Sequence, residues 1–446
     1  MIKIIERLYY ILAVIITEPF QFIIRKNLTK KIWDDWFNNT NNNQAFQKLA
    51  IRKVIKCALK TKYYKSLQAD EKLISNPQLS DFPIISKDDI KNDADNFINT
   101  NKWIAHTKKN TGGSTGRPFE FYDSLYTRQL ELAHQTFFYN RYRCSKGKTI
   151  YSFDGVRISN RLKQKNIFWK RRLRNSPYGS LRMAAIELNH STAIHYINKI
   201  LRSKPSFIRG YPSSITLIAE IVTIMNLQDK FSFLNGIMLS SEKIEEYQIE
   251  KIRQAFGCPV LPQYGMTEAC AFGFTNSNEL LYYCSPFYGI TEILDDHGKH
   301  VAEGDIGEII LTSFGNTYQP FLRYKTGDIA QYGGAKNGFT VLTKLMGRIQ
   351  DYIIGSDHSK IMLIGLIFGA HLSAFKAIKI WQIIQSIPGQ IELRIQPEIN
   401  WNKRLESEII EILNCNKKIQ VKIIYTDQFV LTSTGKRHFV VQNIKI

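Results

Sequence analysis

The feature that most constrains the fold is the alternation of short strand-like and longer helix-like segments between residues 150 and 350. The helix-like stretch "SSITLIAEIVTIMNL" precedes the strand-like "NGIMLSS", and the helix-like "EKIEEYQIEKIRQAF" precedes "CPVLPQYG". Helices that connect strands in this way cover a largely buried sheet, and loops at the strand ends carry function. We therefore predict an α/β fold.

The pattern changes twice further along the chain. Three β-like runs, "YGITEILDD", "GEIILTSF" and "GFTVLTKL", are separated by Asp-His-Gly and Gly-Gly turn signals. After Arg348 a small strand-and-helix module follows, with a helix near Lys403 to Leu413. The sequence thus predicts a hydrophobic amino-terminal helix over residues 1–30, a large domain with mixed sheets and helices over 31–348, and a small α+β domain over 351–446.

The chain is strongly basic, which predicts an anionic partner. It has 60 Lys and Arg against 39 Asp and Glu, a net charge of +21. Nucleic acid, acidic lipid and phosphorylated small molecules are all anionic partners that this positive charge would attract. No nucleic-acid recognition motif accompanies it, so nucleic acid is disfavoured. Cys270 and Cys284 could form half a metal site, although buried isolated cysteines fit the spacing better.

Two segments suggest contact with a membrane surface. The apolar run from Leu8 to Ile16 is nine residues, against about 20 for a spanning helix, and Pro19 is expected to break the helix. The amino-terminal helix either docks on the protein's own core or lies on a bilayer with the basic side chains of residues 1–26 at the lipid phosphates. Residues 161–174, "RLKQKNIFWKRRLR", contain seven basic residues and no acid.

For residues 161–174 three interpretations stay open: a solvated helix face, a coenzyme A phosphate site, or a surface for anionic lipid. Basic residues beside aromatic ones favour the lipid surface. We therefore expect a cytoplasmic protein held peripherally at the inner face of the cytoplasmic membrane.

The stretch "NTGGSTGRPFEFY", residues 110–122, has the composition of an anion-binding loop. It lacks the spacing and the Gly-Lys-Ser/Thr of a Walker P-loop. Its glycines let successive backbone N–H groups turn toward one anion, while hydroxyls and Arg117 add donors and charge. The loop can therefore hold a polyphosphate, although similar stretches are often only turns.

Further polar motifs follow strands or turns. "QYGMTEA" places Thr267 and Glu268 just after a strand, where a hydroxyl meets phosphate and a carboxylate holds Mg²⁺. "LRYKTGDIA" places Asp328 in a turn, and its carboxylate can accept the paired hydrogen bonds of a ribose diol. "MGRIQDYI" adds Arg348, and "LTSTGKRHF" exposes Lys436 on a tight turn.

In this order, TGGSTGRP, YGMTE, RYKTGD, GR-x-x-D and TGK resemble the adenylate-forming superfamily, and within it the phenylacetate-coenzyme A ligase family with its capsular polysaccharide (CapK-like) branch. The resemblance covers nearly the whole chain apart from the first 30 residues and about 155 to 180. It implies a large adenylate-forming domain with a small mobile lid. It also implies activation of a carboxylate with ATP and Mg²⁺ and transfer to coenzyme A.

The resemblance assigns a role to each motif residue. The glycine-rich loop would hold the leaving phosphates through Thr111, Gly112, Gly113, Ser114, Thr115 and Gly116. Glu268 would bind Mg²⁺, Thr267 would contact the α-phosphate, and Tyr264 would lie near the adenine. Asp328 and Arg348 would hold the ribose, and Lys436 would neutralise charge between carboxylate and phosphate. Gln350 departs from the family, whose hinge position is usually Asp or Lys.

Two alternatives stay open. The activated acyl or aminoacyl group could pass to a sugar amine or a carrier protein instead of coenzyme A. Alternatively, the chain could be a non-catalytic, membrane-associated scaffold that retains the fold. Retention of Glu268, Asp328, Arg348 and Lys436 together argues against the scaffold.

Overall fold

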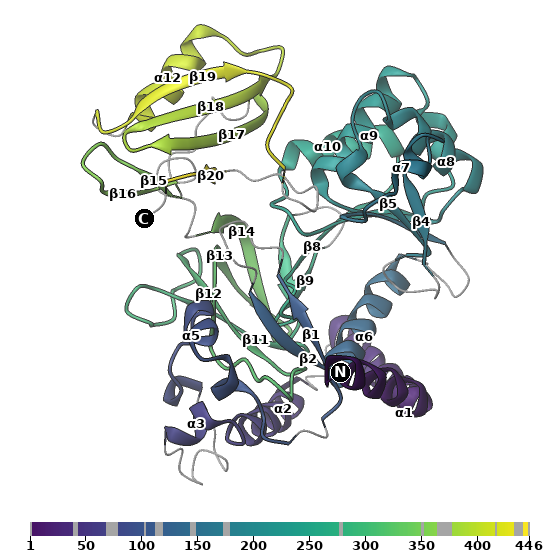
Figure 1. The fold of residues 1–446 in the computed structure, drawn as a ribbon, viewed down its shortest axis with the longest axis vertical. Coiled ribbons are helices and arrows are strands. Elements are labelled where there is room, and N and C mark those ends of the chain that lie inside the picture. The colour runs from purple at the N-terminus through teal and green to yellow at the C-terminus, as the bar shows by residue number, and fades with distance from the viewer. Residues whose placement is uncertain are drawn as a thin grey trace.

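The fold is known from a computed structural model of the chain. It describes residues 2–38, 43–67, 79–101, 104–111, 119–142, 149–172, 179–275, 280–348, 352–363, 377–414, 417–431 and 440–444. Most of the described strands belong to one sheet of 12 strands in the order β11-β12-β13-β14-β10-β9-β8-β7-β6-β3-β5-β4. A smaller four-stranded sheet lies apart from it (Figure 1). The predicted α/β class is confirmed.

One half of the large sheet is mainly parallel. Its strands are β3 (Ile150–Asp154), β4 (Trp169–Arg171), β5 (Leu181–Ala184), β6 (Phe207–Gly210), β7 (Gly236–Leu239) and β8 (Val260–Gly265). Strands β5, β3, β6, β7 and β8 run parallel, while β4 pairs antiparallel with β5 at the edge. The helices of this half are α7 (Asn160–Lys163), α8 (Ala193–Ser203), α9 (Pro212–Ile224) and α10 (Glu246–Phe256), with the 3₁₀ turns η3 (Ala185–Glu187) and η4 (Gln228–Phe231). The apolar faces of α8, α9 and α10 share one hydrophobic core with the strands.

The other half is antiparallel. It consists of β9 (Phe272–Phe274), β10 (Tyr282–Cys284), β11 (Gly289–Leu294), β12 (Ile306–Ser313), β13 (Tyr324–Lys336) and β14 (Phe339–Arg348). The hairpin of β1 (His106–Asn110) and β2 (Glu120–Ser124) leads into α6 (Leu125–Arg141). Asp328 lies within β13 and not in the predicted turn. The reason is a register shift between Glu308 and Ile310 of β12, which leaves Thr326 to Asp328 as an irregular stretch inside the strand.

The amino-terminal elements pack against this antiparallel half. They are α1 (Ile2–Asn38), α2 (Asn43–Ala58), α3 (Lys62–Ser66), η1 (Leu79–Asp81), α5 (Lys87–Asn92) and η2 (Ala94–Phe97). Ser86 caps α5 and forms a reciprocal capping box with Asp89. Before the helix, Ile85 forms a parallel bridge with Tyr324 at the start of β13. This bridge brings α5 to the strand that carries Asp328.

The expected break at Pro19 is wrong, because α1 continues through it to Asn38. Its second half packs on the core, where Leu28 and Ile32 are buried and Trp36 makes edge contacts with Phe274 and Tyr283. Such packing outweighs the helix-breaking preference of one proline. Among the described residues, no helix combines the length and apolarity needed to cross a bilayer.

Residues 352–444, here the small module, have a hydrophobic core of their own. The elements are β15 (Tyr352–Ile354), β16 (Lys360–Met362), β17 (Ile378–Ile387), β18 (Gln390–Pro397), α12 (Lys403–Leu413), β19 (Gln420–Tyr425) and β20 (Val440–Gln442). The helix has the predicted bounds. One ion pair joins the module to the large sheet's helices, with Lys251 of α10 lying 2.9 Å from the Glu398 carboxylate and 3.6 Å from that of Glu220.

A buried histidine forms part of the core below the antiparallel strands. His134 of α6 donates from Nδ1 to the carbonyl oxygen of Leu130 at 2.7 Å and accepts at Nε2 from the Ser285 hydroxyl at 2.8 Å. The carbonyl can only accept, which fixes the proton on Nδ1. Burial lowers the pKa of His134 to about 4. The imidazole is therefore neutral in the folded protein across the physiological range.

His134 makes stability depend on pH. In the unfolded chain its pKa returns to 6.5, so the unfolded state binds the extra proton first as the pH falls. The free energy of unfolding should therefore be fully retained above pH 6.5 and fall by up to about 3 kcal/mol between pH 6.5 and 4. Urea denaturation at several pH values across this range measures the free energy of unfolding. This free energy should change less with pH in His134→Gln than in the parent protein. An unchanged dependence on pH would contradict this assignment.

Candidate functional site

Two reciprocal hydrogen bonds define the candidate site. The Tyr264 hydroxyl, on β8, donates to the Asp328 carboxylate on β13 at 3.0 Å. The Tyr324 hydroxyl, at the start of β13, donates to the Glu268 carboxylate in the turn after β8 at 3.2 Å. Each segment thus carries a tyrosine and, four residues later, a carboxylate that the other segment's tyrosine holds. Two stretches about 60 positions apart in the sequence are locked together in this way.

The two polar residues in the turn after β8 differ in their exposure to solvent. Thr267 is exposed and Glu268 is buried, with 6% of its surface accessible. Ala269 has a positive φ of 55° and donates its N–H to the Met266 carbonyl at 3.1 Å, which closes the turn. The Ser313 hydroxyl donates to the Ala269 carbonyl at 2.9 Å and fixes the turn to β12. As predicted, both residues directly follow a strand.

Asp328 is held on three sides. Besides accepting from Tyr264, it donates its backbone N–H to the Thr326 hydroxyl oxygen at 2.9 Å. That hydroxyl in turn donates to the Ile309 carbonyl of β12 at 2.8 Å. In the backbone register, Asp328 of β13 lies opposite Arg348 of β14. The two residues that the sequence paired for a ribose are therefore cross-strand neighbours.

The glycine-rich loop joins β1 to β2, and the residues that flank it, Thr111 and Phe119, lie near Tyr324 of the candidate site. The Thr111 N–H donates to the Phe119 carbonyl at 2.9 Å and closes the hairpin. Lys87 of α5 lies 3.4 Å from the Thr111 hydroxyl and 5.4 Å from the Phe119 ring centroid. Phe119 stacks on Tyr324, the residue that holds Glu268. Sequence reasoning missed Lys87 and Tyr324.

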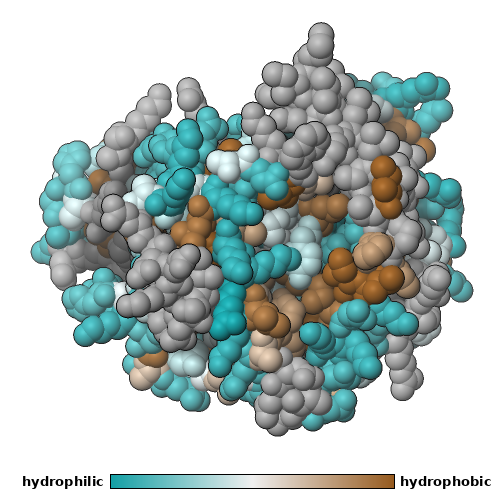
Figure 2. Space-filling view, turned by 90° about the horizontal axis from the view of Figure 1, so that it is seen from below, coloured by the Kyte–Doolittle hydropathy of each residue, from teal (hydrophilic) through white to brown (hydrophobic). Residues whose placement is uncertain are grey.

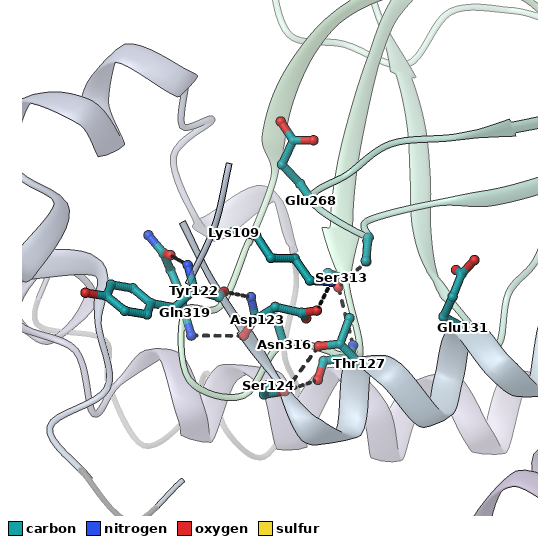
Figure 3. A network of polar contacts seen from close by, with 12 residues as sticks. Lys109, Tyr122, Asp123, Ser124, Thr127, Glu131, Glu268, Ser313, Asn316 and Gln319 are labelled. Carbon is teal, nitrogen blue, oxygen red and sulfur yellow. Dashed lines mark hydrogen bonds and ion pairs between the residues drawn. The ribbon is translucent and has the colours of Figure 1, made fainter. Parts of the chain in front are cut away.

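A buried polar network anchors β2 beside the Glu268 turn (Figure 3). Lys109 of β1 forms an ion pair with the buried Asp123 of β2. The Tyr122 N–H donates to Gln319 at 2.7 Å, and the Asn316 amide donates to the Tyr122 carbonyl at 2.6 Å. These bonds fix the base of the glycine-rich loop against the segment after β12.

The cysteines near the site, Cys270 and Cys284, are buried. Burial, and then the carboxylates of Glu268 and Asp123, raises the pKa of Cys270 well above its usual range. Burial raises the pKa of Cys284 to about 12. Both thiols are therefore protonated in the folded protein. In the described part of the chain, no group of three or more His, Cys, Asp or Glu side chains could hold a metal ion.

Glu268 nevertheless fits a magnesium site that phosphate oxygens complete. Mg²⁺ prefers hard oxygen donors and is commonly bound by one or two carboxylates together with substrate phosphates and water.

Of the other predicted site residues, Thr111, Tyr264, Thr267 and Asp328 are described, and Arg348 is described by its backbone. Gly112, Gly113, Ser114, Thr115, Gly116, Gln350 and Lys436 lie outside the described residues.

The Tyr264 bond gives a test of the site. Tyr264→Phe removes the hydroxyl that orients Asp328, and Asp328→Ala removes the carboxylate that the sequence predicts to accept from a ribose diol. We expect nucleotide binding to weaken about tenfold for Tyr264→Phe and more for Asp328→Ala, because hydrogen bonds to charged groups contribute about 1.5–3 kcal/mol. The dissociation constant for ATP, measured by calorimetry, checks this. The matched control is Tyr332→Phe on the same strand, and an unchanged constant in Asp328→Ala would refute the contact.

Comparison with known proteins gives three kinds of similarity. Residues 185–317 match the family of AMP-binding enzymes. Over 434 residues, 94% of this chain and 89% of the relative, the sequence is 25% identical to Protein CapK of Staphylococcus aureus. The fold is similar to that of 2-hydroxyisobutyryl-CoA ligase in the postadenylation state, with a TM-score of 0.64, 16% identity and coverage of 89% of this chain and 88% of that one. It is also similar to a GH3.15 acyl acid amido synthetase, with a TM-score of 0.58, 14% identity and coverage of 90% and 89%.

Proposed function

We propose that the chain, which is similar to AMP-binding enzymes over residues 185–317 and to CapK over 94% of its length, joins a carboxylate to the α-phosphate of ATP and releases pyrophosphate, leaving an acyl-adenylate. The observation that carries this proposal is the reciprocal pair of bonds between Tyr264 and Asp328 and between Tyr324 and Glu268. It sets a carboxylate suited to a ribose and one suited to a metal at fixed positions beside the glycine-rich loop.

The residues divide the work of binding and charge neutralisation. Asp328 would accept hydrogen bonds from the ribose diol, and the exposed Thr267 hydroxyl would donate to the α-phosphate. Glu268 would hold Mg²⁺, which when bound reduces the repulsion between two anionic reactants. Lys87, beside Thr111, adds a cation at the base of the glycine-rich loop. Lys436 of the small module would complete the charge balance when that module closes.

For the second step we propose transfer of the acyl group to coenzyme A in an acid-thiol ligase reaction of the phenylacetate-coenzyme A ligase type. The motif resemblance and the similarity to CapK support a place in capsular or surface polysaccharide biosynthesis. Transfer to a sugar amine or carrier protein is the second candidate. It is favoured by one observation, that this fold is shared by a CoA ligase and an acyl acid amido synthetase.

The proposal predicts ATP-pyrophosphate exchange that depends on a carboxylate. A screen over aryl acids, fatty acids and amino acids should identify at least one acid that drives exchange. AMP release with coenzyme A or with amines then identifies the acceptor. Lys436→Ala should lower exchange about 100-fold or more while ATP binding persists, because the lysine acts in the transition state.

The matched control for Lys436→Ala is Lys403→Ala, which removes an exposed lysine from α12 of the same module. It should exchange at the parental rate. Absence of exchange with every acid would instead favour a non-catalytic scaffold. Collapse of ATP affinity in Lys436→Ala with turnover retained would show that the role assigned to the lysine is wrong.

We also propose that α1 holds the protein peripherally at an anionic membrane surface. Ile16, Phe20 and Ile23 are spaced by four and three residues, so they share one face of α1, and all three are exposed, Ile16 by 74% and Phe20 by 75%. The exposed Lys26 follows on the same helix. Apolar patches also interrupt the hydrophilic surface on the lower side of the molecule, where Figure 1 places α1 and α2 (Figure 2). An apolar stripe with flanking cations suits anionic lipid.

A matched pair of isoleucines tests this membrane contact. Ile16→Ser should weaken binding to phosphatidylglycerol vesicles, measured by co-sedimentation, about tenfold or more, since burial of one such side chain contributes about 1.5–3 kcal/mol. Ile224→Ser removes an equally exposed isoleucine, 75% accessible, from the end of α9. That variant should sediment like the parent. Equal sedimentation of both variants would contradict a role for the α1 stripe.

A further inference from the structure

A pocket at the far edge of the large sheet has the features of a second binding site. It has a volume of about 370 Å³ and is lined by residues that include Lys165, Ile167, Trp169, His195, Lys199 and Arg202. Strands β5, β3, β6 and β7 lie between the edge strand β4 and β8, which carries Tyr264. In Figure 1, α8 and β4 accordingly lie away from β13 and β14. A ligand here would not share the candidate nucleotide site.

One wall of the pocket is the polar face of α8. His195, Lys199 and Arg202 are four and three residues apart, so they share one side of the helix. Tyr196, Ile197 and Ile200 lie on the opposite side and are buried in the core. Because its apolar face is fixed in the core, α8 presents these polar side chains from a rigid support.

The other wall is the turn before β4. Asn166 has a positive φ of 54°, and the Ile167 N–H donates to the Leu162 carbonyl at 2.9 Å, which ties the turn to the end of α7. Trp169 then starts β4, with the Lys199 ammonium 5.8 Å from its ring centroid. The pocket thus combines an aromatic ring with cations from two separate elements.

The cations of the pocket are not neutralised by carboxylates. In the described part of the chain, no ion pair joins Lys165, Lys199 or Arg202 to an acidic side chain, although nearby Lys163 and Arg172 do pair with Glu187 and Asp154. Lys199 and Arg202 are also like charges three residues apart on one helix, an arrangement that destabilises it. A bound anion would remove this repulsion.

We propose that the pocket binds the phosphate group of an organic phosphate, whose apolar or aromatic part lies against Trp169. Lys and Arg form charge-assisted hydrogen bonds with phosphate, and the tryptophan provides a flat apolar contact. Two sources supply this chemistry: a soluble phosphate ester, or the headgroup of an anionic lipid. The site acts independently of adenylate formation.

The test is titration of the full-length protein with phenyl phosphate at constant ionic strength, followed by tryptophan fluorescence. The signal should disappear in Trp169→Phe, which assigns it to the pocket. Lys199→Gln/Arg202→Gln should raise the dissociation constant about tenfold or more, because each lost bond is charge-assisted. Lys48→Gln/Lys56→Gln, which removes two exposed cations from α2, should leave it unchanged.

Co-sedimentation with vesicles of phosphatidylglycerol and phosphatidylcholine in equal parts identifies the source. A lipid headgroup is identified if the Lys199→Gln/Arg202→Gln variant loses vesicle binding while the Lys48→Gln/Lys56→Gln control keeps it. Weakened phenyl phosphate binding with parental vesicle binding identifies a soluble ester. ATP-pyrophosphate exchange at the parental rate shows that the Lys199→Gln/Arg202→Gln variant is folded. Lys165→Gln, at an exposed residue that lines the same pocket, provides a second variant for both assays. The proposal is overturned if these variants match the parent in both assays, or if the fluorescence change persists in Trp169→Phe.

Discussion

The candidate site depends on two hydrogen bonds that cross between β8 and β13. Tyr264 holds Asp328 and Tyr324 holds Glu268, at 3.0 and 3.2 Å. In the sheet order, β9, β10 and β14 lie between these two strands. In a flat sheet four strand spacings would separate them by roughly 19 Å. The antiparallel half must therefore curl strongly, and it is this curvature that brings the two carboxylates into one site.

Close packing beneath the site supports this curvature. Gly273 of β9 lies opposite Tyr264 of β8 in the antiparallel register. A Cβ atom at Gly273 would lie 3.1 Å from the Tyr264 Cβ and 3.3 Å from the Cys284 sulfur. A larger residue would thus push β8 away from β9. The stack of Phe119 on Tyr324 links the glycine-rich hairpin to β13. The site is held by backbone proximity and aromatic packing as well as by its hydrogen bonds.

The sequence predicted the fold class, the strands β7, β8, β11, β12 and β14 and the position of Glu268 after β8, because these depend on local periodicity and short motifs. It did not reveal that Tyr324 holds Glu268 or that Lys87 lies at the glycine-rich loop, since side-chain contacts between distant segments leave no local pattern. It placed Asp328 in a turn, because Thr-Gly-Asp has turn composition and the register shift against β12 arises only from strand pairing. The basic run at residues 161–174 could be recognised in the sequence. The sequence did not indicate that Lys199 and Arg202 of α8 line the same pocket as Lys165 of this run.

The ion pair between Lys251 of α10 and Glu398 of the small module has a consequence for motion. Both side chains are about one-third accessible, 28% and 33%. A contact of this kind contributes about 1 kcal/mol or less and weakens as salt screens it. Thermal fluctuation can therefore break it readily, and both groups regain water when it opens. If the small module closes as proposed, the balance between its docked and released positions should consequently follow the ionic strength around the protein.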